Sequence, residues 1–224
     1  MTAVNVFRSA TEVHICTDGL CLLPNRTCLV SKVHVASHMP LVLATRGLAA
    51  APWMFGAMLS QAFAGFDELV DGLADQFPNM HTRFLRCVPD SGIPAFCEMQ
   101  TPDTELYFAG WSAARQQCEA YFIRAGDERR EYPHPFRLIP IDCLFGGPWL
   151  PMETWLSPDC DDNDDDGLEH DMIALMEAQR HKMPQFIGGF CQVTTLTQHS
   201  VTQRILRRWP EDGKRADQPQ VPVS

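Results

Sequence analysis

The strongest constraint on the fold is a pair of short, alternating apolar segments at the start of the chain. Segments 3–8 and 12–16 both place valine or isoleucine at alternate positions, and a polar turn at 9–11 separates them. Period-two alternation around a short polar turn predicts a β-hairpin. If the hairpin is centred on that turn, Thr2 lies opposite Asp18, within one residue of register. Directly paired residues have Cβ atoms roughly 4.5 to 5.5 Å apart, so a hydroxyl and a carboxylate would share one small region.

The rest of the chain alternates strands and helices in blocks. Strands are expected over 28–35 and 40–47, completing a four-stranded meander with the hairpin, and later over 105–112, 118–126, 186–197 and 201–209. Helical spacing covers 53–76, with a break at Gly65, and 167–181. Blocks of this kind indicate sheets packed face to face and covered by helices, an α+β layered fold rather than a doubly wound one. We expect one domain over 1–209 and a loose polar tail over 210–224.

Charge and cysteine usage exclude several classes of partner. The balance of 18 basic against 28 acidic residues gives a formal charge of -10, which argues against a nucleic-acid partner. The N-terminus does not look like a leader, and no run approaches 18 apolar residues, so we expect a soluble, cytoplasmic protein with no membrane partner. Nine cysteines without a C-x-x-C pair are typical of free thiols rather than of zinc ligands or a disulfide framework. We expect no cofactor and no metal.

Several motifs, taken in order, resemble one family. They are the hairpin ending in Thr-Asp-Gly, the Lys-Val-His-Val segment, the strand ending in Arg-Gly, the helix pair, AGWS before a second hairpin, and the IGGF closing strand. Together they resemble a proteasome β-subunit-like protein of the N-terminal nucleophile (Ntn) hydrolases, from a branch found in bacterial and phage genomes. The resemblance implies a four-layer αββα sandwich.

The resemblance also implies a catalytic site. Thr2, exposed by removal of Met1, corresponds to the family's nucleophile, and its own α-amine to the general base. An unperturbed α-amine has a pKa of about 7.7 to 8.0. Lys32, next to Asp18, would depress that pKa and favour the base form. The N–H of Gly47 resembles the oxyanion donor. Taken singly, Thr2, Asp18 and Lys32 are each typical of residues without a catalytic role, and only their joint placement indicates a shared pocket.

Some positions depart from the family pattern. The family carries Asp-x-x-Ser-Gly-Gly before its closing strand, whereas this chain carries Pro184 and Ile187 where the assisting carboxylate and hydroxyl would be. A non-catalytic Ntn-fold assembly or interaction protein is therefore the alternative to a hydrolase of peptide or amide bonds. Family members associate side by side through their helices, so the resemblance implies a homo-oligomer in either case, and a peptide or protein substrate if the site is active.

An acidic run over 159–171 suggests a third hypothesis, a metal-buffering module. Asp162, Asp164, Asp166 and Gly167 match the first half of an EF-hand loop, but the twelfth position is Ile173 rather than a bidentate glutamate. A solvated acidic loop that caps the following helix explains the run better, because carboxylates are stabilised at the positive end of a helix dipole.

Overall fold

Antiparallel sheets form most of the structure, a computed structural model that describes residues 2–23, 26–36, 38–48, 50–87, 104–126, 134–148, 150–151 and 165–212. The strands are β1 (Val4–Arg8), β2 (Glu12–Asp18), β3 (Leu20–Leu23), β4 (Arg26–Leu29), β5 (Val33–Ala36), β6 (Leu41–Arg46), β7 (Thr104–Ser112), β8 (Gln117–Ala125), β9 (Ile139–Ile141), β10 (Cys143–Gly146), β11 (Phe190–Thr197) and β12 (Val201–Arg208). The helices are α1 (Ala51–Ala62), α2 (Phe66–Cys87) and α3 (Asp165–Lys182). The predicted α+β class is confirmed.

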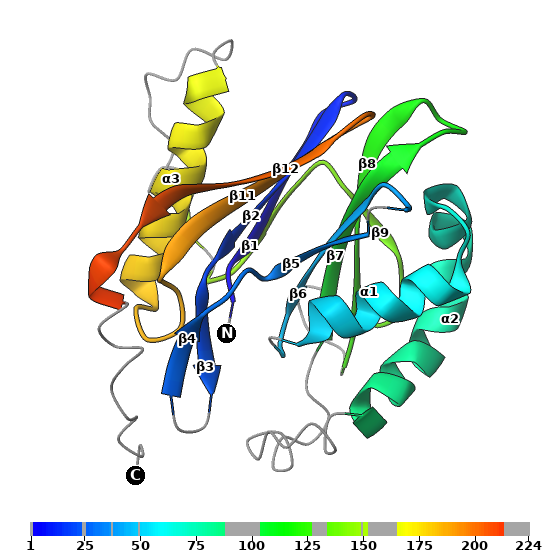
Figure 1. Cartoon of the computed structure of the whole chain (residues 1–224), viewed down its shortest axis with the longest axis horizontal. Coiled ribbons are helices and arrows are strands. Elements are labelled where there is room, and N and C mark those ends of the chain that lie inside the picture. The colour runs from blue at the N-terminus through cyan, green and yellow to red at the C-terminus, as the bar shows by residue number, and fades with distance from the viewer. Residues whose placement is uncertain are drawn as a thin grey trace.

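Two five-stranded sheets are stacked against each other (Figure 1). One has the order β10-β1-β2-β11-β12, the other β5-β6-β7-β8-β9, and β3 pairs with β4 in a separate ribbon. Alternate residues of a strand point to opposite faces, so the valines and isoleucines that predicted the first hairpin all enter the space between the sheets. The buried residues there are Val4, Val6, Val13, Ile15, Val33, Val42, Ala44, Tyr107, Ala109, Cys118, Ala120, Phe122, Ile141 and Leu196.

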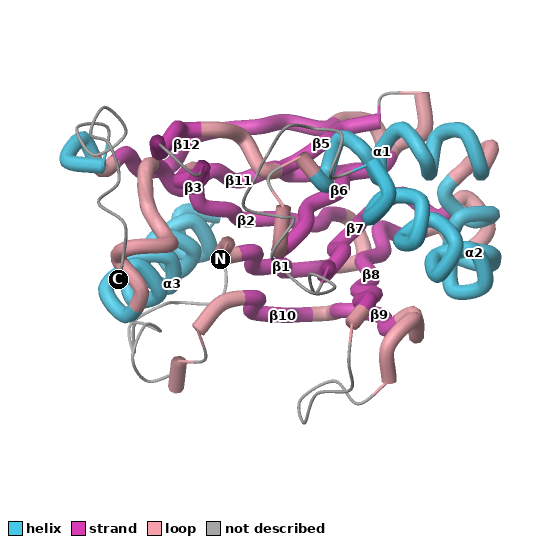
Figure 2. Tube along the Cα trace, turned by 90° about the horizontal axis from the view of Figure 1, so that it is seen from below, coloured by secondary structure: helices cyan, strands magenta, loops and turns pink. Residues whose placement is uncertain are grey.

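Helices cover the outer face of each sheet (Figure 2). α1 and α2 pack on the β5–β9 sheet through an aromatic group that includes Phe55, Phe77 and Phe84. α3 packs on the other sheet through Met172 and Met176, which contact the face that carries Cys16 and Cys191. The predicted break near Gly65 is confirmed, because residues 63–65 separate α1 from α2.

The first hairpin forms, but its register differs by one residue from the predicted register, in which the hairpin was centred on the turn at 9–11. Val4 pairs with Thr17, and Arg8 pairs with Val13. The Ser9 N–H donates to the Glu12 carbonyl at 2.8 Å, so the turn closes over two residues rather than three. The residue opposite Asp18 is therefore Ala3, and Thr2 lies one step beyond it.

The predicted four-stranded meander is wrong. β1 and β2 belong to one sheet, whereas β5 and β6 belong to the other. Gly19 lies at the point where the chain leaves the first sheet, and its N–H donates to the carbonyls of Gly188 and Phe190 at 3.0 and 2.9 Å. The expected strand over 28–35 is split, so Lys32 lies in the link between β4 and β5.

Two edge strands occur in a proline-rich connection where none was predicted. β9 contains Pro140 and adds to the edge of one sheet, and β10 adds to the edge of the other beside β1. Proline lacks the N–H that an inner strand must donate, and an edge position tolerates that loss. At the other end of the chain, Asp212 is fully buried, and the predicted tail from residue 213 onward lies outside the described residues.

Candidate functional site

A buried ion pair marks the end of β2. Lys32 Nζ donates to Asp18 Oδ1 at 2.8 Å, and the two side chains are 4% and 0% exposed. The Ala3 N–H also donates to Oδ1, at 3.0 Å. Oδ2 accepts from the N–H groups of Leu20 and Gly188, at 3.1 and 3.2 Å. Four donors thus replace the water that this carboxylate loses on burial, which makes its burial affordable.

The peptide group that joins Thr2 to Ala3 is held at both of its polar atoms. Its N–H belongs to Ala3 and donates to Asp18, whereas its carbonyl belongs to Thr2 and accepts from Arg46 Nε at 3.0 Å. Thr2 itself is 6% exposed. Charged side chains on both sides therefore fix the first peptide unit of the described chain.

A second buried carboxylate holds Arg46 in place. Arg46 pairs directly with Glu105 across β6 and β7, and its Nη1 donates to Glu105 Oε2 at 2.7 Å. Tyr107 Oη donates to the same oxygen at 2.7 Å. Burial lowers the pKa of Arg46, but the Glu105 charge, Tyr107 and the hydrogen bonds with both together offset this, and the net pKa is raised. Burial, and next the Glu105 charge, raise the pKa of Tyr107 well above its usual value.

Gly47 directly follows Arg46 at the end of β6. Its φ is 125°, in the region that side-chain-bearing residues rarely adopt, and the residue is exposed. A glycine here lets the backbone turn away from the sheet immediately after the arginine that contacts Thr2.

The segment over 184–189 closes the site from the side of β11. Pro184 is exposed and Ile187 is fully buried. Because proline and isoleucine have neither a carboxylate nor a hydroxyl, neither residue supplies an assisting group. The segment contributes backbone instead, because Gly188 donates its N–H to Asp18. Gly188 and Gly189 are buried, and an added Cβ would meet Asp212 Oδ2 at 2.4 Å in the first case and Leu29 at 2.5 Å in the second.

Two thiols lie behind the ion pair on the α3 side of the sheet. The Sγ atoms of Cys16 and Cys191 are 3.3 Å apart, and both residues are fully buried. The hydrogen bond with Cys191, then burial and the Asp18 charge, raise the pKa of the Cys16 thiol well above its usual value. The Cys16 thiol is therefore a neutral packing element under ordinary conditions rather than a nucleophile.

The described residues contain neither a cluster of metal ligands nor a membrane-spanning helix. Among the described residues, no group of three or more His, Cys, Asp or Glu side chains could hold a metal ion. In the same part of the chain, no helix is long and apolar enough to cross a membrane. Asp162 and Asp164 of the acidic run lie outside the described residues, and α3 has already begun at Asp165, so Ile173 sits on a helix rather than in a loop.

Of the four predicted site residues, Asp18 and Lys32 are hydrogen-bonded to each other, and the peptide group after Thr2 is bonded to Asp18. Lys32 donates directly to that carboxylate, which also accepts from the N–H of Ala3, the residue after Thr2. Thr2 itself accepts from Arg46 through its carbonyl, and Gly47 directly follows that arginine. Arg46 and Glu105 were not predicted as site residues. They are 59 positions apart, and only the pairing of β6 with β7 brings them together. The site therefore combines a fixed N-terminal peptide unit with two compensated pairs of opposite charge.

Comparison with known proteins corrects the resemblance drawn from the sequence. No protein-family model and no curated protein matches the chain. Anbu from Yersinia bercovieri, described as an ancestral β-subunit, has a solved structure that matches with a TM-score of 0.60 at 15% identity, over 100% of both chains. A mutant Anbu from Hyphomicrobium sp. strain MC1 matches with a TM-score of 0.58 at 15% identity, over 92% of this chain and 88% of that chain.

The assignment to proteasome β-subunit-like Ntn hydrolases is therefore wrong as it was made. The matching structures are Anbu proteins, which are proteasome-like but distinct, and the identity is too low to carry a family assignment. What these matches show is the fold alone: the chain shares the fold of the two Anbu structures.

Proposed function

We propose that the chain is an N-terminal threonine hydrolase of peptide or amide bonds, active once Met1 is removed. The observation that supports this most directly is the peptide group between Thr2 and Ala3, held by Asp18 on one side and Arg46 on the other. A fixed first peptide unit is what a terminal nucleophile needs, because misplacement of reacting atoms by about 1 Å can cost 10²-fold in rate. The proposal includes the finer description of the fold as a four-layer αββα sandwich.

In the proposed reaction the Thr2 hydroxyl attacks a carbonyl carbon, and the free α-amine of the same residue accepts the hydroxyl proton. The positive charge of Lys32 disfavours protonation of that amine and keeps it in the base form. The Gly47 N–H donates to the oxygen that becomes negative in the tetrahedral intermediate. The amine then returns the proton to the leaving nitrogen, and water hydrolyses the ester that remains on Thr2.

Asp18 and Arg46 act in this scheme as positioning residues. Asp18 fixes the position of Lys32 and accepts from the Ala3 N–H, and Arg46 donates to the Thr2 carbonyl. Glu105 neutralises Arg46, so the guanidinium adds orientation with little net charge. Asp18 and Lys32 are paired, as are Arg46 and Glu105, so removal of Met1 adds one new ionisable group to the site, the α-amine of Thr2.

A second candidate is a non-catalytic assembly component with the same fold. The observation that favours it is Ile187, a fully buried apolar residue at the position where the family pattern has an assisting hydroxyl. Association into a homo-oligomer belongs to both candidates. Trp53 on α1 is 43% exposed and offers an apolar contact for it. Cytoplasmic location stays a prediction.

Two measurements in sequence test the hydrolase. Intact mass of protein purified without an N-terminal tag is expected to show loss of Met1. Incubation with an electrophile that needs both a hydroxyl and a free amine is then expected to add one adduct, which the Thr2→Ala variant does not form and the Thr2→Ser variant does.

Retained Met1 would reject the hydrolase, because the base would then be an amide nitrogen. A processed chain that takes no adduct would reject it as well. Either result leaves the assembly component as the function, and sedimentation at micromolar concentration would then decide whether that candidate survives, since a monomer has no assembly.

A further inference from the structure

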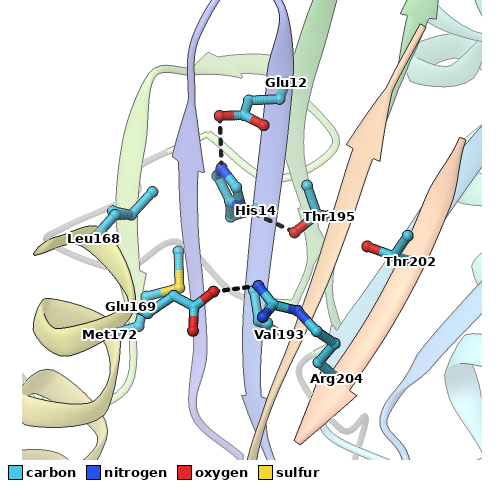
Figure 3. Close-up of a pocket in the computed structure, with 9 residues that line it drawn as sticks. All are labelled: Glu12, His14, Leu168, Glu169, Met172, Val193, Thr195, Thr202 and Arg204. Carbon is cyan, nitrogen blue, oxygen red and sulfur yellow. Dashed lines mark hydrogen bonds and ion pairs between the residues drawn. The ribbon is translucent and has the colours of Figure 1, made fainter. Parts of the chain in front are cut away.

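A small cavity lies on the outer face of the first sheet, away from the Thr2 site. It has a volume of about 170 Å³ and is bounded by β2, β11, β12 and the first turns of α3 (Figure 3). The residues that β2 contributes to it are Glu12 and His14, at the opposite end of that strand from Asp18. Nothing in the hydrolase proposed above uses this cavity.

One wall of the cavity is apolar. Leu168 and Met172 from α3 and Val193 from β11 form it, and Met172 and Val193 are 1% and 2% exposed. A cavity of about 150 Å³ accommodates a benzene ring, so this one fits a molecule of roughly six to nine non-hydrogen atoms. The wall suits an aliphatic group of a few carbons.

A guanidinium and a hydroxyl lie at the β12 side. Arg204 Nη2 donates to Glu169 Oε1, and the Arg204 side chain is 58% exposed. An arginine has five N–H donors, so Glu169 leaves Nε and Nη1 for another acceptor. Thr202 lies two positions away on the same face, and it is the cross-strand neighbour of Thr195. An arginine fork beside a hydroxyl is suited to a carboxylate.

A carboxylate and an imidazole lie at the opposite side. His14 Nδ1 is 3.0 Å from Thr195 Oγ1, which fixes the ring, and its Nε2 is 3.2 Å from Glu12 Oε1. Glu12 is 37% exposed at its side chain, and a carboxylate has acceptor sites on both oxygens. Glu12 therefore keeps capacity for a cationic donor such as an ammonium group.

From these three parts we infer that the cavity binds a free amino acid with an aliphatic side chain. The α-carboxylate lies against Arg204 and Thr202, the α-ammonium against Glu12, and the side chain against Leu168, Met172 and Val193. The mixed charge of the lining favours a zwitterion over a simple anion, because Glu12 and Glu169 would repel a ligand that carries negative charge alone.

The inference is tested by titration calorimetry of the full chain with leucine and two analogues. Leucinamide lacks the carboxylate, and 4-methylpentanoate lacks the ammonium group. Leucine is expected to bind, and each analogue to bind at least about tenfold more weakly, since each lacks one of the two charged groups that the lining would contact. No binding of leucine at millimolar concentration, or equal binding of either analogue, overturns the inference.

Variants locate the binding. Arg204→Gln is expected to weaken leucine at least about tenfold, and Thr202→Val to weaken it by a smaller factor. Arg207→Gln is the matched control, because Arg207 lies on the same strand and pairs with Glu177 on the same helix at 3.5 Å without lining the cavity. Thr2→Ala is expected to bind leucine as the wild type does, which separates this site from the proposed hydrolase. Unchanged binding by both Arg204→Gln and Thr202→Val, in variants whose thermal unfolding matches the wild type, overturns the assignment.

Discussion

A cluster of charged side chains lies at each end of β2, and the two clusters differ in how many of their hydrogen-bonding groups have a partner within the protein. At the Asp18 end, Asp18 and Lys32 are 0% and 4% exposed, and the carboxylate accepts four hydrogen bonds. At the Glu12 end, Arg204 and Glu169 are 58% and 35% exposed, and Arg204 keeps donors to spare. Where every charged group has its hydrogen-bonding partners within the protein, the side chains are fixed in position. Where donors and acceptors are left over, they can bind a ligand. One strand thus joins a rigid site to an open one.

The largest expected effect is at the rigid end. Asp18→Ala leaves Lys32 buried without a counter-charge and removes the acceptor of three backbone N–H groups, so the free energy of unfolding should fall by about 3 to 5 kcal/mol. Urea unfolding measures this. The double variant Asp18→Ala/Lys32→Met should recover part of the loss, since it removes the stranded charge. A fall below about 1 kcal/mol in the single variant would contradict the comparison.

Arg46→Met should have the next largest effect. It removes the donor to the Thr2 carbonyl and leaves the nearly buried Glu105 without its cation, so we expect a loss of about 1.5 to 3 kcal/mol in unfolding free energy. Arg207→Met is the control, because both partners of its ion pair are about half exposed and should contribute less than about 1 kcal/mol.

A second measurement on the Arg46 variant separates positioning from stability. If Thr2 is the nucleophile, Arg46→Met should also slow adduct formation at a temperature where the variant is folded, and Arg46→Lys should restore part of the rate. An unchanged adduct rate would make Arg46 a purely structural residue.

Local sequence patterns predicted many of the strands and helices, but not the contacts between these elements. Period-two alternation located β1 and β2, and helical spacing located α1 and the break at Gly65. The hairpin register was missed by one residue, because the Ser9 N–H to Glu12 hydrogen bond selects a two-residue turn that the alternation cannot reveal.

Long-range pairing explains the larger omissions. Arg46 and Glu105 meet only because β6 and β7 are neighbours, and a sequence without that pairing gives no reason to join them. The cavity near His14 requires β2, β11, β12 and α3 together, so no local segment contains its signal. Lys32 pairs with Asp18 although it lies in a link rather than in the strand that its alternating neighbours suggested.

A smaller effect should appear as a pH dependence at the rigid end. The pKa of Cys16 is raised by its hydrogen bond with Cys191, by burial and by Asp18, so the folded state holds a neutral thiol where the unfolded chain ionises near pH 8.5. A raised folded pKa gives stability that is present below the unfolded pKa and is lost as pH rises above it. Unfolding free energy should therefore decline above about pH 8.5, and Cys16→Ala should decline less steeply. Parallel pH curves would show that Cys16 does not contribute.

The smallest expected effect is at the open end, and it is the sharpest test of the comparison. Arg204→Gln removes an ion pair whose partners are 58% and 35% exposed, and such pairs contribute about 0 to 1 kcal/mol because water and salt screen them. The ligand-free unfolding free energy should therefore change by less than about 1 kcal/mol, as it should for Arg207→Gln. Addition of leucine at 100 times its dissociation constant for the wild type should stabilise the wild type and Arg207→Gln by about 2.7 kcal/mol, and Arg204→Gln by about 1.4 kcal/mol or less if it binds at least tenfold more weakly. A large fall in the ligand-free unfolding free energy of Arg204→Gln would mean that Arg204 stabilises the fold. The charged groups at the Glu12 end would then be structural, as those at the Asp18 end are.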